Sequence, residues 1–360
     1  MKPVKLLLLM ALAVMLPILA PAQSLFVANA GSNTVEQFTY TGGVLNTNGA
    51  VIASSNSGLN GPYGLAFDSS GNLYVANVFS STIVVFTNSS GTLSTTGMVF
   101  AGSSSGLNGP FGLAFDSTGN LYAANYLNST IEKFPCIGGI LNSNGTTLTD
   151  SSLSYPTGLA FDSSGDLYVA NSATFTIEKF AYSGGVLASN GTIFAGSSSG
   201  LNTPYGLVFD GGNNLYVANT YGNTIVKYAY SGGMLNSNGT IFASSGLNNP
   251  AGLAFDSTGS LYVANNYNAM IEKFSSAGNY LGQFAVSGSR PTFLAFQPPF
   301  PTPLNIQLAG MNLVLTWTNR LFNLQSAPTI IGGFTNIPGT TSPYTNAIAG
   351  SQQFFRLQAN

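Results

Sequence analysis

The sequence contains no histidine, a single cysteine and very few charged residues. Lys and Arg together number 9 and Asp and Glu 11, so charged side chains make up 6% of the 360 residues, where soluble domains usually have about a quarter. Without histidine the chain lacks the most frequent general base and the most frequent metal ligand. Cys136 alone allows no internal disulfide, and we expect it to pack as a small apolar residue. The sparse charge gives no basic surface for nucleic acid or an anionic membrane.

The first 22 residues are typical of a secretory signal peptide. Lys2 and Lys5 form a short positive region, an apolar run covers residues 6–19, and Ala20-Pro21-Ala22 supplies small residues for cleavage before Gln23. An N-terminal membrane anchor is the alternative, although the run is short for a membrane span. We therefore expect a secreted, periplasmic or cell-surface protein without membrane insertion after cleavage.

A short segment with the consensus Leu-Tyr-Val-Ala-Asn recurs six times at steps of 46 to 48 residues. Internal repeats of this length are typical of propellers and solenoids. The middle of each copy is β-branched, aromatic or small and apolar, which favours a buried strand. The copies are Leu25–Asn29, Leu73–Asn77, Leu121–Asn125, Leu167–Asn171, Leu215–Asn219 and Leu261–Asn265.

Two further segments accompany each copy, and a fourth completes the unit. Pro-x-Gly-Leu-Ala-Phe-Asp precedes it, Thr-Ile-Glu-Lys-Phe or a variant follows it, and a segment like Gly191–Ala195 comes last. We name these four predicted strands A to D in the order Pro-x-Gly, Leu-Tyr-Val, Thr-Ile-Glu, Gly-Thr-Ile. Four short strands at this period predict the blades of a β-propeller. The strand A segments are Pro62–Asp68, Pro110–Asp116, Pro156–Asp162, Pro204–Asp210 and Pro250–Asp256, with a degenerate copy at 291–297.

The order of the segments predicts how the ring closes. The repeats begin on a strand B, at Leu25, and end on a lone strand A, at Pro291–Phe296. These two halves complete one blade, which removes the exposed edges of a linear array. We therefore expect an all-β fold with a six-bladed β-propeller over residues 23–297. Blades pack face to face, so strands A and B are apolar on both faces, and we expect the charged residues of strand C, such as Glu132 and Lys133, nearer the rim.

This series of segments resembles the NHL repeat and the wider group of propellers related to SMP-30 and gluconolactonase, over residues 24–297. The resemblance implies the six-bladed fold, but the group includes lyases, lactonases and pure binding modules. Its gluconolactonase-like enzymes hold a divalent metal at the axis with acidic and amide side chains, and its streptogramin and amidating lyases depend on histidine. Here the residues that begin strand A, among them Tyr63, Phe111 and Tyr205, are not acidic, and histidine is absent. We therefore expect no enzyme activity, no cofactor and no metal.

A repeated aspartate opens the turn between strands A and B. Asp-Ser-Ser-Gly-Asp at 162–166 resembles half of an oxygen-rich calcium loop, but no acidic residue follows at the required distance. We favour a local role, in which the carboxylate accepts hydrogen bonds from the turn backbone. The residues are Asp68, Asp116, Asp162, Asp210 and Asp256.

The candidate ligand-binding residues lie in the loops of one predicted face. The asparagine that ends strand B offers a ring of amides for a sugar or a peptide, with local capping of the next turn as the alternative. Aromatic residues follow it in several repeats and also precede strand A, and rings beside amides suit polar ligands. Ordinary loop packing is the alternative for these. The candidates are Asn77, Asn125, Asn171, Asn219, Asn265, Tyr63, Phe111, Tyr205, Tyr126, Tyr221 and Tyr267.

Beyond the repeats, four prolines within residues 298–303 predict a stiff linker. Residues 304–360 contain strand-like apolar segments and the only tryptophan, Trp317, which predicts a small all-β, sandwich-like module. Its pattern looks like that of C-terminal β-sandwich modules in exported proteins of environmental bacteria. A module of this size is marginally stable alone. Docking on the propeller, surface binding and a role in export or anchoring are the alternatives for it.

These features predict an exported, monomeric, non-enzymatic propeller that binds a protein or glycan partner through its loop face and serves as a scaffold. Two alternatives stay open. One is a divergent metal-dependent lactonase or hydrolase, and the other is a structural protein of an envelope or matrix.

Overall fold

The computed structural model describes residues 23–41, 44–89 and 91–298, together with the strands between 305 and 359. The predicted signal peptide and residues 299–303 of the predicted linker lie outside the described residues. No helix in the described part of the chain is long and apolar enough to cross a membrane.

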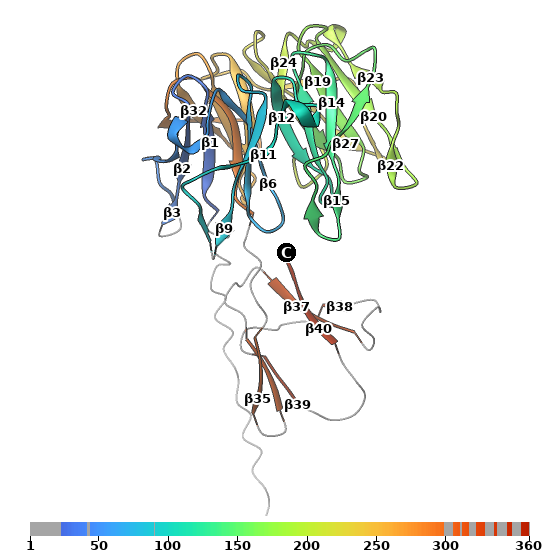
Figure 1. Ribbon diagram of the computed structural model, residues 1–360. Coiled ribbons are helices and arrows are strands. Elements are labelled where there is room, and N and C mark those ends of the chain that lie inside the picture. Colours follow the sequence, from blue (N-terminus) through green and yellow to red (C-terminus); the bar gives the residue numbers. More distant parts are fainter. Residues whose placement is uncertain are drawn as a thin grey trace, which may run out of the picture.

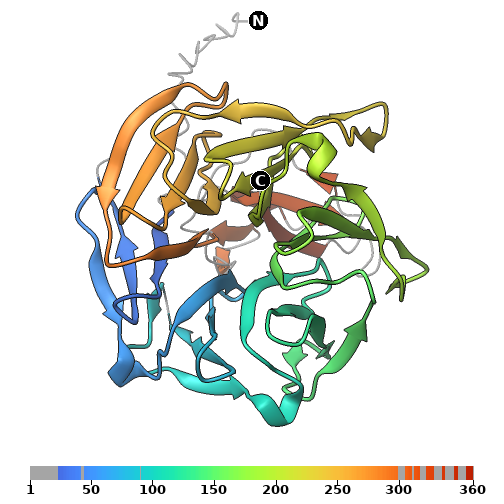
Figure 2. The same ribbon diagram turned by 90° about the horizontal axis from the view of Figure 1, so that it is seen from above.

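Residues 23–298 form the predicted six-bladed β-propeller (Figures 1 and 2). Every blade is a four-stranded antiparallel sheet in which strand A lies innermost and strand D outermost. Blade 1 consists of β34 (Pro291–Phe296), β1 (Leu25–Asn29), β2 (Thr34–Phe38) and β5 (Ala50–Ala53). Blade 2 consists of β6 (Pro62–Phe67), β7 (Leu73–Asn77), β8 (Thr82–Phe86) and β11 (Met98–Ala101).

The other four blades follow the same order. Blade 3 consists of β12 (Pro110–Phe115), β13 (Leu121–Asn125), β14 (Thr130–Phe134) and β17 (Thr146–Thr149); blade 4 of β18 (Pro156–Phe161), β19 (Leu167–Asn171), β20 (Thr176–Phe180) and β23 (Thr192–Ala195). Blade 5 consists of β24 (Pro204–Phe209), β25 (Leu215–Asn219), β26 (Thr224–Tyr228) and β29 (Thr240–Ala243); blade 6 of β30 (Pro250–Phe255), β31 (Leu261–Asn265), β32 (Met270–Phe274) and β33 (Tyr280–Val286).

The ring closes through blade 1, as predicted. Strand β1 pairs with β34, so that Leu25 lies opposite Phe296 and Val27 opposite Leu294. The Gln297 amide donates a hydrogen bond of 2.9 Å to the Ser24 carbonyl, the same bond that closes the continuous A–B turn of every other blade. The ends of the repeat region therefore reproduce a turn without a covalent connection.

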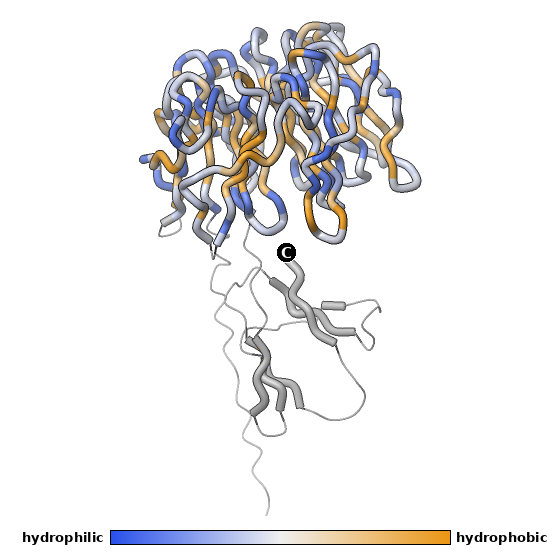
Figure 3. The backbone as a smooth tube through the Cα atoms, viewed as in Figure 1, coloured by the Kyte–Doolittle hydropathy of each residue, from blue (hydrophilic) through white to orange (hydrophobic). Residues whose placement is uncertain are grey.

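The core is divided among the six interfaces between neighbouring blades, and each interface has its own cluster of buried apolar residues. All five residues of every strand B are buried. Figure 3 shows the apolar stretches along the strands inside the ring. Close approach of the inner strands requires glycine, because a Cβ on Gly112 would lie 2.1 Å from the Thr157 carbonyl oxygen of the next blade. The small and large residues of strand A thus nest between blades.

Two features differ from the prediction. Five blades carry an additional two-stranded hairpin between strands C and D, and the half-buried Cys136 belongs to one of them. Glycines with positive φ, such as Gly138 and Gly139, form its turn. The pairs are β3 (Tyr40–Thr41) with β4 (Val44–Leu45), β9 (Asn88–Ser89) with β10 (Thr92–Leu93), β15 (Cys136–Ile137) with β16 (Ile140–Leu141), β21 (Tyr182–Ser183) with β22 (Val186–Leu187) and β27 (Tyr230–Ser231) with β28 (Met234–Leu235).

The second difference concerns the glutamates of strand C, which are not solvated at the rim. Glu132, Glu178 and Glu272 are at most 2% exposed, and burial raises their pKa. Each carboxylate accepts a hydrogen bond from a neighbouring hydroxyl, that of Thr147, Ser152 or Tyr280. Strand C is the third strand from the axis, as predicted, but its glutamates are enclosed, because hydroxyls of β17, β33 and a D–A loop satisfy their carboxylates.

Beyond the propeller, the described strands form two three-stranded antiparallel sheets. Almost none of the side chains of these strands is described, and Trp317 lies outside the described residues. One sheet contains β35 (Asn305–Ala309), β36 (Asn312–Thr316) and β39 (Tyr344–Ala347), and the other β38 (Thr335–Asn336), β37 (Phe322–Ala327) and β40 (Phe354–Ala359).

Candidate functional site

The ring has two faces that differ in their loops (Figures 1 and 2). The turns between strands B and C and the loops between strand D and the next strand A form what we call the upper face. The A–B turns and the C–D hairpins form the lower face. All aromatic candidate residues belong to connections of the upper face or to the adjoining first residues of strand A.

The asparagines that end strand B are buried, with exposed fractions of 0 to 2%. Their Oδ1 atoms accept hydrogen bonds from backbone N–H groups of the preceding D–A loop, and their Nδ2 groups donate to carbonyls of the same loop. Asn125, for example, accepts from the Asn108 amide at 3.0 Å and donates to the Gly106 carbonyl at 2.9 Å. Asn77, Asn171, Asn219 and Asn265 repeat both bonds. These amides hold the loops of the upper face in place, so any contribution of theirs to a ligand is indirect.

One residue per blade, directly before the proline of strand A, has a left-handed backbone with φ between 50° and 62°. Its carbonyl accepts a hydrogen bond of 3.0 to 3.3 Å from the residue that follows the buried asparagine. This bond holds the residue before the proline at the edge of the upper face. The six positions are Gly61, Gly109, Tyr155, Thr203, Asn249 and Arg290.

Six aromatic side chains from five blades gather around the axis at the upper face, and we call them the axial aromatic cluster. Phe111, which is 3% exposed, lies at its centre. Its ring centroid is 4.2 Å from that of Tyr63, 5.3 Å from Tyr126, 5.2 Å from Tyr205 and 6.0 Å from Phe293. Tyr155 extends the cluster outward, 5.0 Å from Tyr126. Such edge-to-face and stacked pairs favour a rigid arrangement.

The hydroxyls of Tyr63, Tyr126 and Tyr205 stay protonated at neutral pH. Burial raises the pKa of Tyr63, Tyr126 and Tyr205, and the nearby Arg290 guanidinium counteracts this in part for Tyr63 and Tyr205. No hydrogen bond from another described residue occupies these three hydroxyls. They are therefore free to donate to, or accept from, a polar ligand.

The structure brings four of the aromatic candidates together, namely Tyr63, Phe111, Tyr126 and Tyr205. Tyr221 and Tyr267, which are 67% and 81% exposed, lie outside the ring contacts of the cluster. Sequence reasoning missed Tyr155, Phe293 and Arg290. Their positions in the repeat could have indicated them. Tyr155 and Arg290 directly precede the proline of a strand A, and Phe293 replaces the glycine of the last strand A.

On the lower face, each repeated aspartate caps its own A–B turn. Oδ1 of Asp68 accepts hydrogen bonds from the Ser70 and Asn72 amides, both at 2.9 Å. Asp116, Asp162, Asp210 and Asp256 repeat this pair of bonds. The expected local role of these carboxylates is confirmed.

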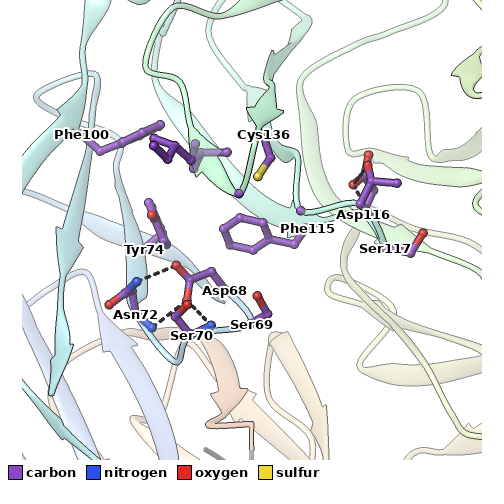
Figure 4. Close-up of a pocket in the computed structure, with 15 residues that line it drawn as sticks. Asp68, Ser69, Ser70, Asn72, Tyr74, Phe100, Phe115, Asp116, Ser117 and Cys136 are labelled. Atoms are coloured by element: carbon purple, nitrogen blue, oxygen red, sulfur yellow. Dashed lines mark hydrogen bonds between the residues drawn. The ribbon is translucent and has the colours of Figure 1, made fainter. Parts of the chain in front are cut away.

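Two grooves open on the lower face between neighbouring blades. The first lies between blades 2 and 3, has a volume of about 540 Å³ and includes Asp68, Tyr74 and Phe115 (Figure 4). The second, about 490 Å³, lies between blades 5 and 6 and includes Asp210, Tyr216 and Phe255. Burial, reinforced by Asp68, raises the pKa of Tyr74 to about 12.

The residues around the axis do not fit the divalent metal that the family resemblance implies. Such ions prefer carboxylates and other oxygen ligands. The carboxylates of the ring lie in strand C, in the A–B turns or in the D–A loop at Asp150. No group of three His, Cys, Asp or Glu residues in the described part of the chain could hold an ion. Thr157 and Thr292, which begin two inner strands, direct their hydroxyls at backbone carbonyls instead.

Comparisons with known proteins agree with this fold. Residues 138–240 and 211–302 match the model of the SMP-30/Gluconolactonase/LRE-like region. No curated protein matches the sequence. A chain of the nidogen/laminin complex superposes with a TM-score of 0.61 at 17% identity, covering 76% of this chain and 98% of the other. A gluconolactonase of Xanthomonas campestris gives 0.50 at 19% identity, covering 71% and 82%, and a Bacteroides caccae protein of unknown function gives 0.50 at 14%, covering 78% and 100%.

The family match overturns one expectation, that the chain is not an enzyme. It points to a lactonase-type enzyme. The sequence contains no histidine, and no inner strand of the described ring begins with a carboxylate. The repeats and the fold show a six-bladed β-propeller, and over residues 138–302 its sequence is similar to the SMP-30/gluconolactonase-like group.

Proposed function

We propose that the propeller recognises a glycan, or a protein ligand that presents similar polar groups, through the axial aromatic cluster of its upper face. The observation that carries the proposal is the convergence of aromatic residues from four blades around Phe111, with the hydroxyls of Tyr63, Tyr126 and Tyr205 unoccupied. The apolar faces of a sugar ring stack on aromatic side chains, while its hydroxyls hydrogen-bond the phenols.

Two further features support a sugar-like ligand. The rings of the cluster pack on one another, so little side-chain entropy is lost when a ligand binds. Arg290 is the only basic residue of the described upper face, and a surface of phenols with a single cation suits an uncharged or weakly acidic glycan. The N-terminal 22 residues support export, which would place this face outside the cell.

The proposal predicts glycan binding that depends on the cluster. Screening the full chain against neutral and acidic oligosaccharides, followed by calorimetry with the best ligand, should give binding that Tyr126→Ala and Tyr205→Phe each weaken about ten-fold, as expected for the loss of a stacking or hydrogen-bonding contact of about 1.4 kcal/mol. Tyr182→Ala, in a lower-face hairpin, is the matched control and should bind normally. Failure of every glycan to bind would exclude a glycan and leave the protein ligand, and equal binding of the best ligand by Tyr126→Ala would contradict the role of the cluster.

Lactone hydrolysis is a second candidate for the same face, and the family match favours it. A protonated phenol could donate a hydrogen bond to the lactone carbonyl oxygen as negative charge develops on it. Titration at constant pH should then detect acid release from an aldonolactone above the uncatalysed rate, with a reduction of at least ten-fold in Tyr205→Phe and none in Tyr182→Ala. No acceleration by the unaltered chain would eliminate this candidate and leave the binding proposal standing.

A further inference from the structure

The groove between blades 2 and 3 combines an apolar wall with a polar end. Figure 4 shows Asp68, Asn72 and Tyr74 close together, with Phe115 and Cys136 beside them and Asp116 farther along the groove. Phe100, Phe115, Ile140 and Leu141 provide the apolar lining. Tyr74 is 6% exposed, and its ring is held edge-on by Phe100 and Phe115 at centroid distances of 5.4 and 5.3 Å.

Four other blades place a lysine ammonium at the position that corresponds to the polar end of this groove. In blades 3 to 6, a lysine of strand C lies directly opposite the strand B tyrosine and on the same side of the sheet. The Nζ atoms lie 4.9 to 5.6 Å from the ring centroids, within the range of a cation–π interaction. The pairs are Lys133 with Tyr122, Lys179 with Tyr168, Lys227 with Tyr216 and Lys273 with Tyr262.

The A–B turn supplies a carboxylate for the same ammonium in two of these blades. Lys179 lies 2.6 Å from Asp166, and Lys273 lies 3.9 Å from Asp256. The ring is thus common to all four blades, while the aspartate comes from the end of the turn at Asp166, the position of Asn72 in blade 2, and from its start at Asp256, the position of Asp68.

Blade 2 keeps the tyrosine and the aspartate but has no lysine. Val85 lies opposite Tyr74 at the corresponding register position. The Asp68 carboxylate accepts hydrogen bonds from neutral donors only, the amides of Ser70 and Asn72 and the Asn72 side chain at 2.7 to 2.9 Å. Within the described residues, neither Asp68 nor Asp116 takes part in an ion pair.

We propose that the groove between blades 2 and 3 binds a primary alkylammonium group, either a small amine or a lysine side chain. The ammonium takes the place of the missing lysine beside Tyr74 and Asp68, and the alkyl chain lies along Phe115 and Leu141. The site is on the lower face and is independent of the function proposed for the upper face. The groove between blades 5 and 6 serves as an internal comparison, because Lys227 already lies 5.2 Å from the ring of its Tyr216.

Titration of the full chain with n-pentylamine, followed by NMR or calorimetry at neutral pH and low salt, tests the proposal. We expect saturable binding that 1-pentanol does not show, since the alcohol has the same chain without the charge. Val85→Lys supplies the ammonium internally and should weaken binding at least ten-fold without loss of folding, because four blades carry lysine there. Asp68→Asn should weaken binding several-fold, and added salt should weaken it further.

Val99→Lys is the matched control, since it adds the same charge to blade 2 at a residue that is 68% exposed and lies on strand D. It should bind pentylamine normally. Equal binding of amine and alcohol, or undiminished binding by Val85→Lys, would overturn the proposal. Replacing pentylamine by an N-acetyl-lysine amide distinguishes the two sources of the ammonium: binding of both probes indicates that a lysine side chain fits, and binding of pentylamine alone indicates a small free amine.

Discussion

Single residues that depart from the repeat give this propeller its individual properties. Val85 leaves a tyrosine and an aspartate without the lysine that other blades supply. Phe293 replaces the glycine of strand A and contributes its ring to the axial aromatic cluster. Tyr228 ends strand C of blade 5, where the other five blades have phenylalanine. In each case the fold is retained, and the change appears in a local cavity, a surface or a buried polar atom.

The Tyr228 hydroxyl is predicted to destabilise the fold. Tyr228 is 0% exposed, its hydroxyl has no hydrogen-bond partner among the described residues, and burial raises its pKa. An unpaired buried hydroxyl costs about 1–3 kcal/mol. Tyr228→Phe restores the residue of the other blades and should increase the free energy of unfolding by about 1 kcal/mol, measured by urea denaturation.

Phe86 provides the matched control for this prediction. It ends strand C of blade 2. Each of the two rings faces a glycine, Gly97 for Phe86 and Gly239 for Tyr228, and lies 3.0 Å from the position that a Cβ on that glycine would take. Both sites also have a valine two residues earlier in the strand, Val84 before Phe86 and Val226 before Tyr228. Phe86→Tyr should therefore destabilise the protein by a similar amount. Loss of stability in Tyr228→Phe would mean that the hydroxyl has a partner that the described contacts do not include.

At the scale of elements, the sequence predicts strands A and B because both of their faces are apolar and their ends are marked by Pro, Asp and Asn, and it predicts strands C and D because their segments recur in the repeats. The C–D hairpins escape prediction because two-residue strands such as β15 carry too few residues to show an alternating pattern. The Gly-Gly pairs between the strands of four of these hairpins were the available signal. Likewise, the burial of Glu178 depends on Ser152, which comes from a loop of the preceding repeat, and no local pattern reports that contact.

The candidate site is predicted only in part, for a related reason. The recurrence of Asn125 and its equivalents marks them as important, but their amides satisfy loop backbone, which only the packing of the D–A loop on the B–C turn reveals. Tyr63, Phe111 and Tyr205 could be placed near the axis because they begin inner strands. Phe293 could not, since its contact with Phe111 joins the last strand A to the third blade across the axis. Likewise, the groove at Tyr74 emerges only when equivalent positions of different blades are compared in three dimensions.

At the scale of the whole molecule, the ring is continuous in its hydrogen bonds although the chain is not continuous at blade 1. Every A–B turn is closed by a bond between the residue after strand A and the residue before strand B, at 2.9 to 3.0 Å, and in blade 1 Gln297 and Ser24 form it. Leu25 and Phe26 of β1 are fully buried in the interfaces with the neighbouring blades. The stability of the ring should therefore depend on β34 being present, and not on where the chain begins.

A circular permutant tests this dependence. With residues 23–298 as the reference, Gln297 is joined to Ser24 through Ser-Ser-Gly, which copies the A–B turn of the other blades, and the chain is opened between Ser117 and Thr118, both exposed in the turn of blade 3. Because the strands at the junction are already paired, the permutant should have the same circular dichroism and a free energy of unfolding within about 1 kcal/mol of the reference. Deleting residues 291–298 from the reference exposes one edge of β1 and the apolar faces beside it, so cooperative urea unfolding should be lost. A permutant that is several kcal/mol less stable, or a deletion that unfolds like the reference, would show that closure through blade 1 contributes little to the stability of the ring.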